Sequence, residues 1–162
     1  MQNSGQNPLP SALFLILLFI VFASAPVLTD MLRYQREAIS SGQFWRLFTG
    51  HFVHLNMAHA LLNSSGTLLL AFFLAKDIQT KDWWVITLIA PLVISAGLWW
   101  REPELVSYAG FSGVLHGLLY YVVIRLIPEM PFVASSVLLL LVSRQLWEQT
   151  SAYNPEDLRT LI

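Results

Sequence analysis

The sequence predicts an all-α membrane protein with five membrane-spanning helices. Hydrophobic residues make up 56% of the 162 residues and charged residues 12%, and the mean hydropathy is +0.59. Soluble domains carry about 25% charged residues. The apolar residues also fall into five long runs, and a helix needs about 20 mainly apolar residues to cross a bilayer. A net charge of −1 gives no basic surface, which excludes nucleic acid as an expected partner.

Each predicted span is bounded by polar or turn-forming residues. The expected spans are residues 12–28, 54–75, 83–100, 112–127 and 131–147. Thr29 and Asp30 end the first run, Lys76 ends the second, and the sequence from Arg101 to Glu104 ends the third. The last two spans are separated by a Pro-Glu-Met-Pro turn, residues 128–131.

The remaining segments are expected to lie outside the hydrocarbon. Residues 30–50 mix arginines with aromatic residues, a pattern typical of a partly amphipathic segment at the membrane interface. Residues 148–162 form a polar tail.

The N-terminus lacks the positive region of a signal peptide, so the first span is expected to stay in the mature protein. We treat residues 1–162 as a single domain. The Lys and Arg residues lie on both sides and do not decide the orientation.

Polar residues inside the apolar runs are candidates for function, because such residues are costly in hydrocarbon. His59 and Asn63 are four residues apart and so share one helix face. Two hydrogen-bond donors on an inward face can stabilise an oxyanion, or they can join neighbouring helices. His51 and His54 precede them, but the spacing of the three histidines matches no zinc pattern, so we expect neither a metal nor a cofactor.

Ser112 is the candidate nucleophile. It lies in the sequence Gly110-Phe111-Ser112-Gly113 at the start of the fourth span. The Gly-x-Ser-x-Gly elbow of soluble hydrolases does not fit, because the second glycine follows the serine directly. A helix N-terminus nevertheless favours negative charge, and glycines let a substrate backbone come close. The alternative is that Gly113 and Gly117 form a helix-packing face and Ser112 has no chemical role.

Taken together, these residues resemble a rhomboid intramembrane serine protease. The resemblance rests on Trp45 to Thr49 followed by His54, His59 and Asn63, and on the Gly-x-Ser-Gly sequence at Ser112. It implies a rhomboid-like helical bundle in which Ser112 is the nucleophile and His59 and Asn63 form the oxyanion hole. Gly110 and Gly113 would then lie where the substrate approaches.

The sequence of residues 111–118, FSGVLHGL, is most similar to the rhombosortase subgroup. That resemblance implies cleavage of exported proteins at a C-terminal anchor made of a Gly-Gly motif, an apolar span and a basic tail. The partners would be the substrate's transmembrane helix and membrane lipid. The site would open on the extracytoplasmic side of a bacterial inner membrane.

The sequence departs from the family at the general base, which in rhomboids is a histidine near the start of a sixth span. We find no sixth span and interpret the 162 residues as a form truncated before it, inactive as it stands. His116 follows Ser112 by four residues and is a possible base. Its other expected roles are an interhelical hydrogen bond or a wall of the site.

Three functions therefore remain open. The first is a rhombosortase-like protease that needs a sixth helix. The second is a catalytically dead relative that binds transmembrane helices. The third, from another class, is a small membrane scaffold or transport component whose polar residues only join helices.

Overall fold

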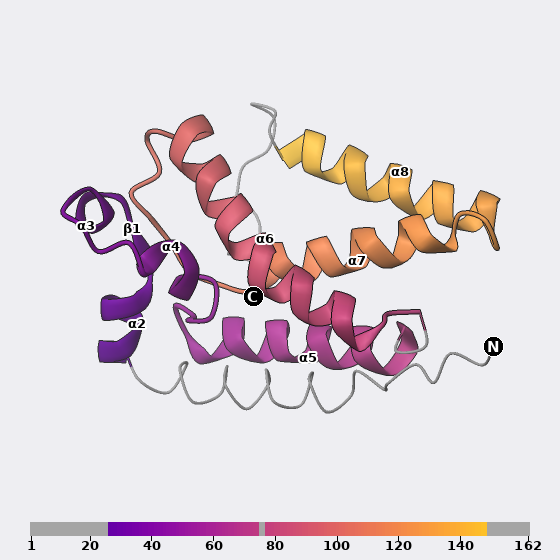
Figure 1. The fold of residues 1–162 in the computed structure, drawn as a ribbon, viewed down its shortest axis with the longest axis horizontal. Helices are drawn as coiled ribbons and strands as arrows, with labels where there is room; N and C mark the ends of the chain where they lie inside the picture. Colours follow the sequence, from indigo (N-terminus) through magenta and orange to yellow (C-terminus); the bar gives the residue numbers. More distant parts are fainter. Residues whose placement is uncertain (1–25, 75–76, 149–162) are drawn as a thin grey trace. The chain divides into compact units, whose positions relative to one another are not determined.

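A computed structural model describes residues 26–74 and 77–148 of the chain (Figure 1). Most of the first predicted span and nearly all of the polar tail lie outside these residues. The chain divides into two compact units with the boundary between Leu119 and Tyr120. We describe each unit by itself.

The predicted second, third and fourth spans are helical. They correspond to α5 (Met57–Leu74), α6 (Thr80–Arg101) and α7 (Ser112–Leu126), the last of which crosses the unit boundary. Helix α5 begins three residues later than predicted, because Asn56 caps it: its side-chain Oδ1 accepts a hydrogen bond from the backbone N–H of His59 at 2.8 Å. Helix α6 is longer than predicted at its start, by one turn.

By length and composition alone, one helix of the described part, α6, is long and apolar enough to cross a membrane. The other apolar stretches are shorter: Met57–Phe73, Ser112–Leu126 and Pro131–Ser143. Helix α7, with 15 residues, covers roughly 22 Å at 1.5 Å per residue. The hydrocarbon layer is about 30 Å thick. The number of five spans therefore stays a prediction.

The segment expected at the interface folds into short elements. These are the last part of α2 (Pro26–Leu32), β1 (Tyr34–Gln35), α3 (Arg36–Ser40) and α4 (Arg46–Thr49). Strand β1 pairs antiparallel with β2 (Ser107–Tyr108), so that Tyr34 lies opposite Tyr108. The pairing joins this segment to the loop just before α7, a connection that the sequence did not predict.

Glycines let the helices of the first unit approach closely. A Cβ atom at Gly66 of α5 would lie 3.2 Å from the side chain of Leu115 in α7. On α7, a Cβ at Gly117 would contact Ile86 of α6 at 3.7 Å. Such small residues replace the hydrophobic effect as the means of bringing helices together inside lipid.

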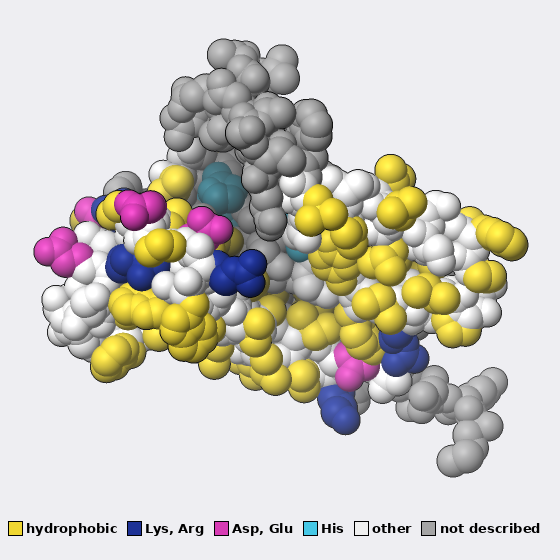
Figure 2. All heavy atoms as spheres, turned by 90° about the horizontal axis from the view of Figure 1, so that it is seen from above, with side chains coloured by type: hydrophobic (Ala, Val, Ile, Leu, Met, Phe, Trp, Pro, Cys, Tyr) yellow, Lys and Arg dark blue, Asp and Glu magenta, His cyan; other side chains and the backbone are white. Residues whose placement is uncertain are grey.

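Large apolar side chains cover much of the face seen in Figure 2, while charged side chains lie at the end that carries α2 to α4 and in a smaller group at the lower edge of the view. On α5, for example, Leu61 and Leu62 are more than half exposed. An apolar surface of this extent is typical of a protein surrounded by lipid.

The second unit contains the end of α7 and helix α8 (Pro131–Glu148). Pro131 occupies the first position of α8, where its missing N–H costs nothing. The Tyr120 hydroxyl donates a hydrogen bond of 2.8 Å to Gln145 Oε1, which links the two helices within this unit. The predicted fifth span is thus helical.

Arg36 closes the C-terminal end of α6. Its guanidinium donates hydrogen bonds to four backbone carbonyl oxygens, at 2.8 to 3.3 Å, and stacks on the Trp99 ring at 4.6 Å. The acceptors are Leu98, Trp99, Glu102 and Leu105. A helix end leaves its last carbonyls without partners, and a cation there also interacts favourably with the helix dipole.

Replacing Arg36 by Met is therefore expected to lower the free energy of unfolding by about 2 kcal/mol, because hydrogen bonds from a charged donor are lost. The measurement is unfolding in mixed detergent micelles, followed by tryptophan fluorescence. Arg33→Met is the control: Arg33 pairs with the exposed Asp30 carboxylate at 2.9 Å, and such pairs contribute less than about 1 kcal/mol. Equal losses in the two variants would contradict the capping role.

Candidate active site

The two polar motifs of the sequence meet where the His59 ring lies against Gly110. A Cβ atom at Gly110 would lie 2.6 Å from His59 Cε1 and 2.8 Å from Nε2. These distances are too short for any side chain, so only glycine allows the imidazole to occupy this place. Ser112 is two residues further along the chain. The structure therefore brings His59 to the loop that carries the candidate nucleophile.

Both sides of Gly110 are held by hydrogen bonds. Its N–H donates to the Gly50 carbonyl oxygen at 3.0 Å, and its own carbonyl oxygen accepts from the Tyr108 hydroxyl at 2.9 Å. Its φ of +132° lies in the region that favours glycine. Gly50 in turn must be small, because a Cβ there would lie 2.5 Å from the backbone N of Tyr34.

Ser112 is the first residue of α7 and is partly exposed. Its neighbour Phe111 is fully buried and packs on the Phe52 ring, with 5.6 Å between the ring centroids. The buried phenylalanine anchors the loop, and the serine follows at a helix N-terminus. That end of a helix offers free N–H groups and a positive dipole end, which suit a developing negative charge.

Asn63 is 4% exposed and lies one turn after His59 on α5. Its side-chain Nδ2 donates a hydrogen bond of 3.1 Å to the backbone carbonyl oxygen of His59. An amide nitrogen carries two hydrogens, so one donor remains for a second acceptor. His59 also meets the His54 ring edge-on, with 5.0 Å between the centroids.

His116 faces the backbone of Ser112. Its Nδ1 lies 2.8 Å from the Ser112 carbonyl oxygen, which can only accept, so Nδ1 carries the ring proton. The ring also lines a small cavity of about 150 Å³ together with Gly66, Leu70, Leu115 and Leu119. His116 is thus positioned by its own helix, one turn after the serine.

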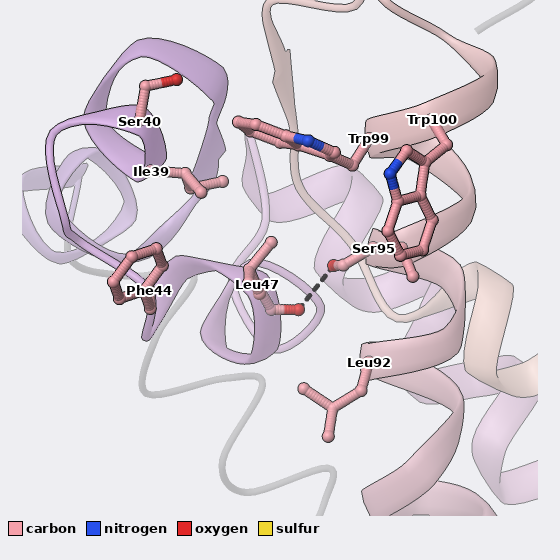
Figure 3. A pocket seen from close by; sticks show the side chains of 9 residues that line it. Ile39, Ser40, Phe44, Leu47, Leu92, Ser95, Trp99 and Trp100 are labelled. Carbon is pink, nitrogen blue, oxygen red and sulfur yellow. Dashed lines mark hydrogen bonds between the residues drawn. The ribbon is translucent and has the colours of Figure 1, made fainter.

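His51 lies against α6. Its Nε2 is 3.0 Å from Ser95 Oγ, and Ser95 donates its single proton to the Leu47 carbonyl oxygen (Figure 3). His51 Nε2 is therefore the donor in this contact. The ring also packs against Tyr108, with 5.1 Å between the centroids. Sequence reasoning considered His51 only as a metal ligand and missed its link to Ser95 and Tyr108.

Arg46 and Thr49 of the first motif hold the interfacial segment together. Arg46 is 7% exposed and donates from its guanidinium to the carbonyl oxygens of Asp30 and Arg33, both at 2.9 Å. Thr49 Oγ1 donates to the Leu32 carbonyl oxygen at 2.7 Å. These bonds fix the end of α2 on α4, just before the loop that leads to His59.

A cavity of about 670 Å³ lies between α3, α4 and the last turns of α6 (Figure 3). Its walls are almost entirely apolar: Ile39, Ser40, Phe44, Leu47, Leu92, Ser95, Ala96, Trp99 and Trp100. None of the candidate catalytic residues lines it. The candidate residues His59 and Ser112 lie instead where glycines let α5 approach α7 and the loop before it.

Comparison with known proteins places most of the chain in one family. The model of the Rhomboid domain matches residues 41–147, which include both polar motifs. No curated protein matches the chain.

Gly110→Ala is expected to destabilise the protein by at least about 2 kcal/mol, because the new methyl group clashes with His59 and the backbone angle is unfavourable. Gly42→Ala isolates the second effect: Gly42 has a φ of +99° and open space around it, so about 1 kcal/mol is expected. A double-mutant cycle of Gly110→Ala with His59→Ala measures the clash itself. Strict additivity would mean that the ring does not rest on Gly110.

The stability of the fold should also decrease below neutral pH. Burial lowers the pKa of His51, which precedes α5, from 6.5 to about 4. Between these values His51 is neutral when folded but takes up a proton when unfolded, so stability is full above pH 6.5 and is lost toward pH 4. Its share reaches about 1.4 kcal/mol per pH unit.

Unfolding at pH 7 and pH 5 measures this effect. His51→Gln keeps a donor toward Ser95 but does not titrate, and it is expected to show a smaller loss between the two pH values than the unmodified protein. Identical losses would mean that His51 is accessible to protons in the folded state.

Proposed function

Because the chain belongs to the rhomboid family, and is therefore an integral membrane protein, we propose that it is an intramembrane serine protease with Ser112 as nucleophile. Rhomboid proteins act on transmembrane helices inside membranes. The observation that carries the proposal for this chain is the contact of His59 with Gly110. It places a ring nitrogen from α5 beside the loop that begins α7, which is what a shared site requires.

The proposed chemistry is acyl transfer. Ser112 Oγ attacks the carbonyl carbon of the scissile peptide bond and loses its proton to a base, while the carbonyl oxygen becomes an oxyanion. His59 and the free N–H of Asn63 donate to this oxyanion, and fixed donors of this kind contribute several kcal/mol in a site that excludes water. The C–N bond then breaks, the leaving amine takes a proton, and water releases the acyl group from Ser112.

The structure favours none of the four histidines, all within the described residues, as the general base. His51 donates to Ser95, and the His54 ring packs edge-on against the His59 ring. His59 lies against Gly110, and His116 is bonded to the carbonyl of its own helix. A base must reach Oγ and be held in the right tautomer by a third group. We propose that a histidine outside the 162 residues takes the proton of Ser112, as the resemblance to rhomboids implies.

The proposed substrates are exported proteins with a rhombosortase-type anchor: a Gly-Gly motif, an apolar span and a basic tail. Small residues next to the scissile bond suit a site whose own loop contains Gly110 and Gly113. The proposed location is a bacterial inner membrane, with Ser112 toward the extracytoplasmic side.

The second candidate function is binding without cleavage. It is favoured by the same placement of the histidines, because a serine without a base is a poor nucleophile. In this case the protein would hold transmembrane helices of its clients, and Ser112 would not matter for binding.

Ser112→Ala distinguishes the two. We expect the complete product of the gene, in membranes, to cleave a Gly-Gly-anchored reporter and Ser112→Ala to reduce cleavage at least about 1000-fold. Ser107→Ala, in the same loop on an exposed position, is the matched control and should retain full activity.

Labelling of the protein by a fluorophosphonate probe gives a second readout of serine activation. The 162 residues alone are expected to label weakly. Undiminished cleavage by Ser112→Ala would refute the protease, while client helices that co-purify equally with both forms would support binding.

A further inference from the structure

Tyr108 has no role in the function proposed above, yet its hydroxyl lies inside the loop that carries the nucleophile. We propose that Tyr108 is a positioning residue: by holding the Gly110 carbonyl, it fixes the course of the backbone into Ser112. The catalytic consequence rests on the proposed function of Ser112. The structural part stands independently of it.

The first step is the contact itself. The Tyr108 hydroxyl donates to the Gly110 carbonyl oxygen at 2.9 Å, two residues ahead of it in the chain. The other side of Gly110 is fixed through its N–H, which donates to Gly50. A glycine has the widest conformational freedom of any residue, so a loop around it points in one direction only if both of its polar groups are held.

The second step is the space left for the hydroxyl. A Cβ atom at Gly113 would lie 3.5 Å from the Tyr108 oxygen and 2.9 Å from Ile94 Cδ1. The glycine after the nucleophile therefore lets α6 and the tyrosine approach the first turn of α7. Tyr108 and Gly113 thus flank Ser112 in the sequence, four residues before it and one residue after it.

The third step is that the Tyr108 ring is itself held. The His51 ring packs against it, and His51 is bonded to Ser95 of α6. The backbone of Tyr108 pairs with Tyr34 in the short β1–β2 ladder. The position of the hydroxyl is thus determined by α6 and by the interfacial segment, not by the loop alone.

The protonation of Tyr108 is consistent with a donor. Burial raises its pKa, and hydrogen bonds with the Ser112 side chain and the Gly113 backbone act against that increase. The phenol therefore keeps its proton at neutral pH and can donate it to the Gly110 carbonyl oxygen.

The test removes the hydroxyl and nothing else. Tyr108→Phe keeps the ring against His51. Tyr120→Phe is the matched control, because it also removes one tyrosine hydrogen bond of similar length, to Gln145 in the other unit. Tyr34→Phe is a second control: within the described residues, its buried hydroxyl has no hydrogen-bond partner.

The first measurement is hydrogen exchange of the backbone amides of residues 110–113 in the purified protein. In Tyr108→Phe we expect these amides to exchange at least about 5-fold faster, with α5 and α6 unchanged and the thermal midpoint within about 2 °C. Neither control should alter residues 110–113. Unchanged exchange at these residues in Tyr108→Phe would overturn the proposal.

The second measurement is cleavage of the anchored reporter by the complete protein. Tyr108→Phe is expected to lower kcat about 10-fold with KM within 2-fold, because the nucleophile is misdirected while substrate binding is kept. Faster exchange with unaltered kcat would overturn the positioning role. Faster exchange with no cleavage by any form, the unmodified protein included, would support the structural hold and refute the protease instead.

Discussion

The site depends on where the backbone hydrogen bonds of the loop before α7 are made. Ala109, Gly110 and Phe111 in this loop are buried, and a buried backbone N–H or C=O group without a partner costs several kcal/mol. Here the interfacial segment supplies the partners. Gly50 accepts from Gly110, β1 pairs with β2, and the backbone N–H of Arg36 donates to the Val106 carbonyl oxygen at 3.0 Å. The backbone in front of Ser112 is held because the interfacial segment provides these hydrogen-bond partners.

The same constraint explains the two arginines of the interfacial segment. Arg36 and Arg46 both donate to several backbone carbonyls that a helix end or a turn leaves unpaired. A guanidinium has five donors in a fixed plane, so one side chain can satisfy several acceptors at once. The basic residues that suggest an interface in the sequence are, in the structure, also the residues that make irregular backbone tolerable there.

The sequence predicted the helices of α5 to α8 because long apolar runs leave little choice at these positions. The Ser112 loop and the His59 and Asn63 face were predicted from spacing and from the family resemblance, and their roles stay proposals. The pairing of β1 with β2 was out of reach, since two residues have no detectable period. The link from His51 to Ser95 spans 44 residues and depends on how α6 packs, which no local pattern contains.

The contact between His59 and Gly110 has a consequence for how such sequences diverge. A bulkier residue at position 113 meets the flexible end of Ile94, and a shorter side chain at position 94 can make room. A bulkier residue at position 110 meets the His59 ring, which must then leave this place. Gly110 and His59 should therefore covary: sequences that keep the imidazole in this place keep the glycine, and sequences that lose the imidazole become free to change both.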